Sequence, residues 1–414
     1  MSNINGVTIQ KGKVGANRRN VKRAVSALII GSVASADLAL NTPQTVYNIE
    51  DLEQYGITPE FDSTNNLNVY RHFSEFFRMA GAGTELHFML VDQAETFGTI
   101  LADASETMAK RLLAFAKHDV RQLGVCLNPD ETPTPVDGLP DDALTAIAAA
   151  QGLYAWADEN HMPLQIFLEG HNLSGAANVV PDLRDIENVK ATKVTYVIGQ
   201  DWAYAETKTG IAQKFADVGT VLGVCSAARI NQNIGDNEEF DLTDATRNAW
   251  MVPGLSNHKK NDEVYSQLQT FEDKGYVFGL EYAGLAGVRI NNDHVCAPIE
   301  IDQEGNMNEH TIAYGRILDD ARRQLRTVYL PKIKKTYPVG TDGKLPVGVR
   351  TSLELVGDAV FGDMQNAAEI SNGKTTIDPD SDIMVEKELI VGFNLQPTGV
   401  IGYLNGTINL KQRI

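Results

Sequence analysis

The sequence offers few arrangements of residues that could carry out chemistry, and the best of them resembles a phosphate-binding loop. Residues 368–375, AEISNGKT, end in the Gly-Lys-Thr of the motif GxxxxGK[ST] but lack its first glycine. That motif holds phosphate when a strand precedes it and a helix begins after it. Here a helical pattern precedes it and Ile377-Asp378-Pro379 follows. We therefore expect no nucleotide site and interpret Asn372-Gly373 as the end of a helix.

Other motifs of catalysis and cofactor binding are equally weak. Gly81-Ala82-Gly83 ends a helical stretch and lacks the third glycine of a dinucleotide loop. The eight histidines show neither the HxxxH nor the HExxH spacing of a zinc site. No GxSxG elbow supplies a nucleophilic serine, and His171 and His294 lie in stretches that contain Asn or Gly. We expect no catalytic residue, no cofactor and no metal, and hence a protein that is not an enzyme.

Charge is distributed unevenly along the chain. The 414 residues include 54 acidic and 36 basic ones, a net charge of −18 that disfavours nucleic acid as the main partner. The first 36 residues carry no acid and no aromatic side chain that could stack on a base. We interpret this start as a basic arm on an acidic body. Its basic residues are Lys11, Lys13, Arg18, Arg19, Lys22 and Arg23.

Residues 17–37 also resemble an export signal, with basic residues, an apolar run and Ala34-Ser35-Ala36 as a cleavage site. The alternative function is therefore a secreted or periplasmic α/β binding protein or enzyme, cleaved after Ala36. The apolar run is rich in β-branched residues, which favours a buried strand over residues 25–33. We expect this segment to stay on the chain. Three widely spaced cysteines without a pairing pattern favour a reducing compartment.

Helical and extended patterns alternate along most of the chain. This alternation predicts an α/β fold with a largely parallel mixed sheet covered by helices, plus extended arms at both ends. Strands are expected at 25–33, 85–91, 123–127, 164–168, 193–198, 276–281 and 288–290, with extended segments at 383–395 and 399–410. Helices are expected at 68–80, 105–117, 143–159, 210–218, 312–336 with a kink at Pro331, and 349–370.

These elements divide into six predicted segments. A surface loop containing four prolines is the clearest boundary between them. The segments are an intersubunit arm at 1–23, the first part of the α/β core at 24–128, the proline-rich loop at 129–140, the rest of the core at 141–295, a C-terminal domain with a basic helix at 296–382, and C-terminal strands and arm at 383–414.

Both ends of the chain resemble the contractile tail sheath proteins of phages and related injection systems. At the N-terminal end the matching stretches are VSALIIGSVA (25–34), VYNIEDLEQYG (46–56) and YRHFSEFFRMAGAGTELHFMLV (70–91). At the C-terminal end they are YGRILDDARRQLRTVYLP (314–331) and LIVGFNLQPTGVIGYLNGTINL (389–410). Each motif is weak by itself, and the order of the motifs carries the resemblance. Residues 101–275 match only in α/β character.

The resemblance implies a structural subunit that polymerises helically around an inner tail tube and contracts to drive that tube through an envelope. Its partners would be further copies of itself, the tube protein, and baseplate and tail terminator proteins, without nucleic acid or membrane insertion. It would be part of a virion tail or an injection particle assembled in the bacterial cytoplasm; phage and cellular systems are not distinguished. The arms would add strands to neighbouring subunits. Besides the six basic residues, the predicted arm residues are Leu389, Val391, Phe393, Ile408 and Leu410.

The basic helix suggests the contact with the tube. Seven basic and two acidic residues lie between Arg316 and Lys335 on an otherwise acidic chain. One interpretation is a tube-facing surface, and the other is a solvated helix face that pairs with acids of its own body. Asn405-Gly406 raises a second choice, between a two-residue hairpin turn and one continuous strand, which the family pattern favours. The residues expected to face the tube are Arg322, Arg326, Lys332, Lys334 and Lys335.

Overall fold

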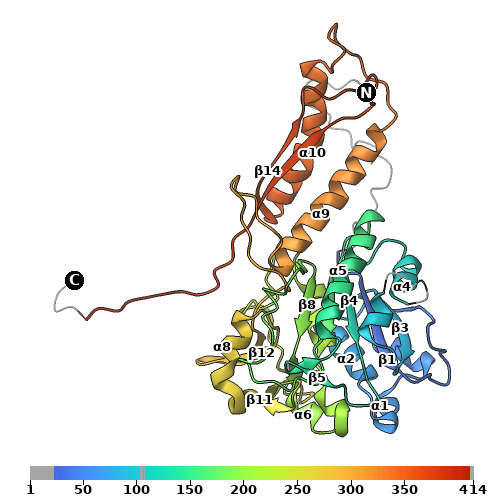
Figure 1. The fold of residues 1–414 in the computed structure, drawn as a ribbon, viewed down its shortest axis with the longest axis vertical. Coiled ribbons are helices and arrows are strands. Elements are labelled where there is room, and N and C mark those ends of the chain that lie inside the picture. The colour runs from blue at the N-terminus through green and yellow to red at the C-terminus, as the bar shows by residue number, and fades with distance from the viewer. Residues whose placement is uncertain (1–22, 103–105, 107, 411–414) are drawn as a thin grey trace, which may run out of the picture.

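The computed structural model describes residues 23–102, 106 and 108–410. It has a large α/β body and a smaller C-terminal lobe that stands on it (Figure 1). The body is built on a six-stranded sheet, in which every neighbouring pair is parallel except β2 with β3. The order across the sheet is β2 (Gln44–Val46), β3 (Leu86–Asp92), β1 (Ser26–Ser32), β4 (Gln122–Cys126), β7 (Gln165–Glu169) and β8 (Val194–Val197). This confirms the predicted largely parallel, helix-covered sheet.

Strand β1 lies within the stretch that resembles an export signal. It lies inside the sheet, paired with β3 on one side and β4 on the other, and all seven of its residues are buried. Cleavage after Ala36 would remove this strand and split the sheet. The apolar run of the stretch that resembles a signal is therefore part of the fold. Among the described residues, no helix is both long and apolar enough to cross a membrane.

Helices cover both faces of the sheet because the buried strands are apolar on both sides. Leu28 and Ile30 of β1 face one core, and Ala27 and Ile29 face the other. In helix α7, Gly219 allows the close approach of α2, since a Cβ at this position would lie 2.2 Å from the carbonyl oxygen of His72. The first face is covered by α2 (Val69–Ala80) and α7 (Val218–Ala227), and the second by α3 (Phe97–Leu101), α4 (Ala109–Phe115) and α5 (Ala143–Glu159).

Short elements complete the body around the sheet. They include a three-stranded sheet in the order β11-β10-β9 and two small hairpins. The strands are β5 (Pro135–Val136), β6 (Leu139–Pro140), β9 (Gly199–Asp201), β10 (Pro253–Leu255), β11 (Lys259–Lys260), β12 (Gly279–Tyr282) and β13 (Leu285–Ile290). The helices are η1 (Glu50–Tyr55), α1 (Pro59–Asn65), α6 (Trp202–Ala205), η2 (Gly210–Lys214), η3 (Asn261–Val264) and α8 (Tyr265–Asp273).

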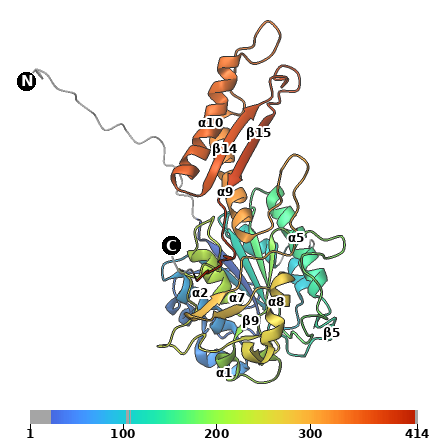
Figure 2. The same cartoon turned by 90° about the vertical axis from the view of Figure 1, so that its left-hand side faces the viewer.

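Helix α9 carries the chain from the body into the lobe, where it packs beside a second helix and a two-stranded ribbon (Figure 2). Ile317, Leu325, Phe361 and Met364 form the core of this lobe. The elements are α9 (Ile312–Tyr329), η4 (Leu330–Lys332), α10 (Val347–Asn366), β14 (Ile370–Ile377) and β15 (Val391–Pro397). The helix expected to kink at Pro331 thus ends at Tyr329 and continues as the short η4.

Three sequence-based expectations were wrong. The helix expected at 210–218 is instead η2 followed by α7, which begins at Val218; α7 is buried all round and so lacks an amphipathic period. Asn372-Gly373 does not end a helix, because α10 ends at Asn366 and these residues lie in β14. Residues 399–410 form no regular strand, although the absence of a hairpin at Asn405-Gly406 agrees with the family pattern that was favoured.

Candidate assembly surface

The C-terminal arm, defined here as residues 398–410, exposes its apolar side chains. It leaves the foot of the lobe and extends away from the rest of the chain (Figure 1). Ile401 and Leu404 are each 84% exposed, and Ile408 is 99% exposed. Soluble monomers rarely leave a continuous row of large apolar residues in water. The arm therefore has the character of a segment that another surface covers.

The order of residues in the arm suits a β-strand with one apolar face. In a strand, alternate residues point to the same side. The odd-numbered residues from Asn405 onward are polar. The even-numbered residues from position 400 onward are apolar or glycine: Val400, Gly402, Leu404, Gly406, Ile408 and Leu410. At the start of the arm the odd-numbered face is apolar too, with Ile401 and Tyr403. If the arm pairs with a sheet, one side can therefore pack on a core while the other faces solvent.

The lobe offers an edge to which such a strand could be added. Strands β14 and β15 pair antiparallel, from Ile377 opposite Val391 to Ile370 opposite Pro397. Side chains of α10 occupy the outer edge of β14, where the amides of Thr375 and Ile377 donate to Asp358 and Glu354. In the described part of the chain β15 has no strand partner besides β14, so the edge of the ribbon formed by β15 is open. A two-stranded ribbon is marginally stable alone, and an open edge is a template for a further strand.

Three residues assigned to an intersubunit arm lie in or beside this ribbon. Val391 and Phe393 pair with Ile377 and Thr375 of β14 in the same chain, and Leu389 packs beside them. They are therefore engaged within their own subunit, where they shape the ribbon, while Ile408 and Leu410 lie in the exposed arm. Arg23 is the first described residue, and Lys11, Lys13, Arg18, Arg19 and Lys22 lie outside the described residues.

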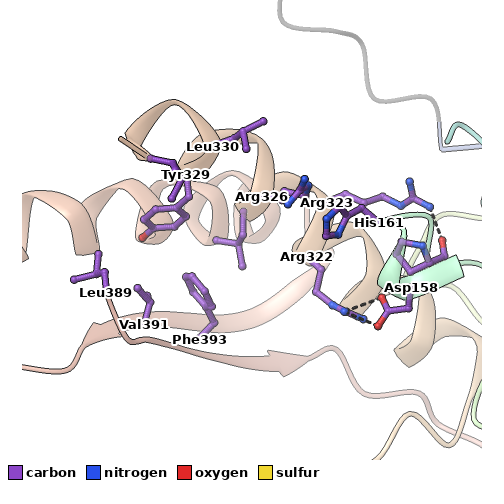
Figure 3. Close-up of a pocket in the computed structure, with 13 residues that line it drawn as sticks. Asp158, His161, Arg322, Arg323, Arg326, Tyr329, Leu330, Leu389, Val391 and Phe393 are labelled. Carbon is purple, nitrogen blue, oxygen red and sulfur yellow. Dashed lines mark hydrogen bonds and ion pairs between the residues drawn. The ribbon is translucent and has the colours of Figure 1, made fainter. Parts of the chain in front are cut away.

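A groove of about 580 Å³ runs along α9 beneath β15 (Figure 3). One helical stripe of α9 and η4 forms one side, and inward-facing side chains of the ribbon form the other. The rings of Tyr329 and Phe393 meet across it, with centroids 5.7 Å apart. Leu330 and Ile333 are 57% and 65% exposed at its upper end. The apolar lining residues are Leu325, Tyr329, Leu330, Ile333, Leu389, Val391 and Phe393.

The lower end of the groove is charged, and its arginines are already engaged. Arg322 forms an ion pair with Asp158 at 2.7 Å (Figure 3). It also donates to the Tyr154 hydroxyl. Arg323 donates to the carbonyl oxygens of Val120 and Pro163. Burial, with the nearby charge of Arg121, lowers the pKa of Arg323 to about 9. The part of the basic helix nearest the body thus pairs within the chain.

The outer part of the basic helix has no such partners. Arg326, Lys334 and Lys335 are exposed and Lys332 is half-buried. Within the described residues, no ion pair joins any of the four to an acid. Of the five residues expected to face the tube, Arg322 is therefore held by its own body, and the other four form a basic surface next to the groove.

One buried group could be considered for a metal ion. Ligand atoms of His72, Cys126 and Glu169 lie within 4.8 Å of one another. The amide of Gly219 donates to Nδ1 of His72 at 3.3 Å, which uses the one lone pair of the neutral imidazole. Burial lowers the pKa of His72 to about 3 and raises that of Glu169 to about 8. Because the neutral imidazole that accepts from Gly219 has no second lone pair to offer, we expect no metal ion at this group.

Comparison with known proteins places the chain in a family. The family model of DUF2586, N-terminal domain, matches residues 6–294, which is more than half of the sequence. The chain belongs to the DUF2586 family. No curated protein matches it in sequence.

Solved structures show which fold this DUF2586 chain has. The helical sheath of the anti-feeding prophage (AFP) in its contracted state is similar over 99% of both chains, with a TM-score of 0.58 and 11% identity. The contracted AFP baseplate gives a TM-score of 0.60 and 11% identity over 98% of both chains. A contracted extracellular contractile injection system, the PVC sheath complex, gives 0.54 and 10% over 100% of this chain and 99% of the other. The chain therefore has the contractile sheath fold, as the resemblance at both ends predicted.

Proposed function

We propose that this DUF2586 protein is a structural subunit of a contractile sheath. It polymerises helically around an inner tube and contracts to drive the tube through a target envelope. Further partners are the baseplate and the tail terminator, and the particle is a virion tail or an injection machine assembled in the bacterial cytoplasm. The observation that carries the proposal is that one chain has both an exposed apolar arm and an open-edged ribbon above an apolar groove.

The arm and the ribbon belong to different copies in this proposal. The arm leaves the foot of the lobe and runs away from the ribbon, so a neighbour's ribbon is the natural acceptor (Figure 1). Adding a strand to an edge supplies main-chain hydrogen bonds, and alternate side chains fill the pocket below. Each large apolar side chain that becomes buried contributes roughly 1.5–3 kcal/mol. A donor on one surface and an acceptor on another give a head-to-tail contact, which generates a helical filament when it does not close.

The two basic regions take separate roles. The N-terminal arm, from Lys11 to Lys22, lies on a neighbouring subunit, where its charge complements the acidic bodies, while Arg23 stays with its own lobe. Arg326, Lys332, Lys334 and Lys335 face the tube. Exposed ion pairs contribute only about 0–1 kcal/mol each, so a contact made of several can hold the sheath and still release it during contraction.

Electron microscopy of the purified full-length chain tests the proposal. Wild type and Thr407→Asp/Asn409→Asp, which alters the polar face of the arm, should form hollow tubes. Ile408→Asp/Leu410→Asp should remain monomeric, because it places charge on the face that enters the groove. Its unfolding temperature should match wild type, since both side chains are exposed in the monomer. A wild-type chain that stays monomeric at high concentration would contradict a sheath function.

A further inference from the structure

The first and last described segments outside the folded core are fastened at the same place. This place is the α10–β14 turn, residues 367–369, between Asn366 and Ile370. One side of the turn holds Arg23, where the N-terminal arm meets β1. The other side is tied through Asn231 to Thr398, the first residue of the C-terminal arm. Segments that are far apart in sequence thus share one attachment.

Arg23 is held by acids from two elements of the lobe. Its guanidinium donates to Oδ2 of Asp320 in α9 at 2.8 Å and to both carboxylate oxygens of Glu369, one of them at 3.2 Å. The side chain of Arg23 is 37% exposed, whereas those of Asp320 and Glu369 are 4% and 9% exposed. Loss of Arg23 would therefore leave two nearly buried carboxylates without this cation, which is costly.

Asn231 makes the second attachment from a turn that follows α7. Its side-chain amide donates to the carbonyl oxygen of Ala368 at 2.9 Å and to the Thr398 hydroxyl at 3.1 Å. Ala368 has a left-handed backbone with φ of 56°, which is uncommon for a residue that has a Cβ. Ser371 also donates to the carbonyl oxygen of Pro397. The conformation of the turn and the start of the C-terminal arm are thus fixed together.

We propose that Arg23 and Asn231 are positioning residues that anchor both arms to the α10–β14 turn. Force on either arm then passes into the lobe at one point, and the body sheet carries little of it. The use of this anchor in a lattice rests on the proposed sheath function, but its existence in the single chain does not. Its distinguishing consequence is coupling: loosening Arg23 should loosen the start of the C-terminal arm, although the Arg23 side chain bonds only Asp320 and Glu369 among the described residues.

Spin-label distance measurements on the full-length monomer test this coupling. The native cysteines Cys126, Cys225 and Cys296 are buried, so labels can be directed to exposed engineered ones. One label stands on α1 of the body, at Glu60→Cys, and the second stands at Lys22→Cys or at Gly399→Cys. A Cβ at Gly399 has open space around it. Wild type should give a single narrow distance distribution for each pair.

The variants are Arg23→Ala, Glu369→Gln, Asn231→Ala and, as a control, Arg111→Ala on the exposed face of α4. Arg23→Ala and Glu369→Gln should broaden both distributions, and Arg111→Ala should change neither. Glu369→Gln keeps the shape of the side chain and serves if Arg23→Ala fails to fold. Broadening at Lys22→Cys alone would overturn the shared anchor. If wild type never forms tubes, the sheath proposal fails. The distance distributions of the monomer still show whether both arms share one anchor.

Discussion

The body and the lobe differ in how completely their strands are paired. In the body, the inner strands of the sheet are paired on both sides, and helices bury both faces. In the lobe, the ribbon has an open edge at β15 among the described residues, and an apolar groove lies beside it. The body completes its own structure, while the lobe leaves a place for a further strand. In the proposed sheath, this difference leaves folding to the body and assembly to the lobe and the arm.

The largest effect on stability is expected for a network of buried ion pairs in the body. Arg71 of α2 is buried and pairs with Asp201 and Asp217 at 3.1 Å each. Arg71→Ala leaves these acids buried without their cation and should lower the free energy of unfolding by about 3–5 kcal/mol in urea titrations. The control Arg111→Ala should stay within about 0.5 kcal/mol of wild type. A similarly small change for Arg71→Ala would show that the body does not depend on this network.

A second, pH-dependent effect is expected where the body meets α9. Asp293 accepts from the amide of Ala313 in the first turn of α9, and burial raises its pKa to about 7. The folded chain keeps this proton up to about pH 7, whereas the unfolded chain loses it near pH 4. Because the folded state binds more protons in this window, the contribution of Asp293 to stability is present below about pH 4 and is lost as the pH rises through 7.

Asp293→Asn tests this sign. The amide cannot lose a proton, so the variant should gain stability relative to wild type as the pH rises from 4 to 7, by roughly 2–4 kcal/mol over the window. Denaturant titrations of both proteins at several pH values give the difference directly. Opposite contributions from other groups, such as His72, cancel in this comparison. A difference that does not change with pH would mean that Asp293 is ionised in the folded chain.

The smallest effect on stability is expected on the basic surface of the lobe. Lys334→Glu/Lys335→Glu should change the free energy of unfolding by less than about 0.5 kcal/mol, because both side chains are exposed and unpaired among the described residues. The same variant should reduce the number of tubes that become sheathed in negative-stain images. Lys259→Glu on the body is the control, because it reverses the charge of one exposed lysine away from the lobe. Unchanged sheathing would remove these lysines from the tube contact.

The sequence predicted the body well because its strands and helices carry regular patterns. The β-branched run at 25–33 became the inner strand β1, and the periodic helix at 68–80 became α2. It missed α7, where Gly219 and Gly223 allow close packing that no amphipathic period reveals.

The assembly surface was predicted only in part. The exposed arm follows from the apolar residues near the C-terminus, but the assignment of Val391 and Phe393 to β15 depends on their partners in β14. That pairing is set by packing on Phe361 and Tyr329, which lie far away in sequence. The pairing of Arg322 with Asp158 depends likewise on tertiary structure.

In the proposed sheath, the C-terminal arm of one subunit is added as a strand to the ribbon of the next subunit. Disulfide crosslinking tests it most directly, because the three native cysteines are buried. Ile408→Cys is combined in the full chain with Leu389→Cys, Val391→Cys or Phe393→Cys, and assembled samples are oxidised and run on a denaturing gel. We expect a ladder of covalent multimers for at least one pair and none for Ile408→Cys with Lys259→Cys. Assembled tubes that give no ladder with any ribbon position would contradict this strand addition.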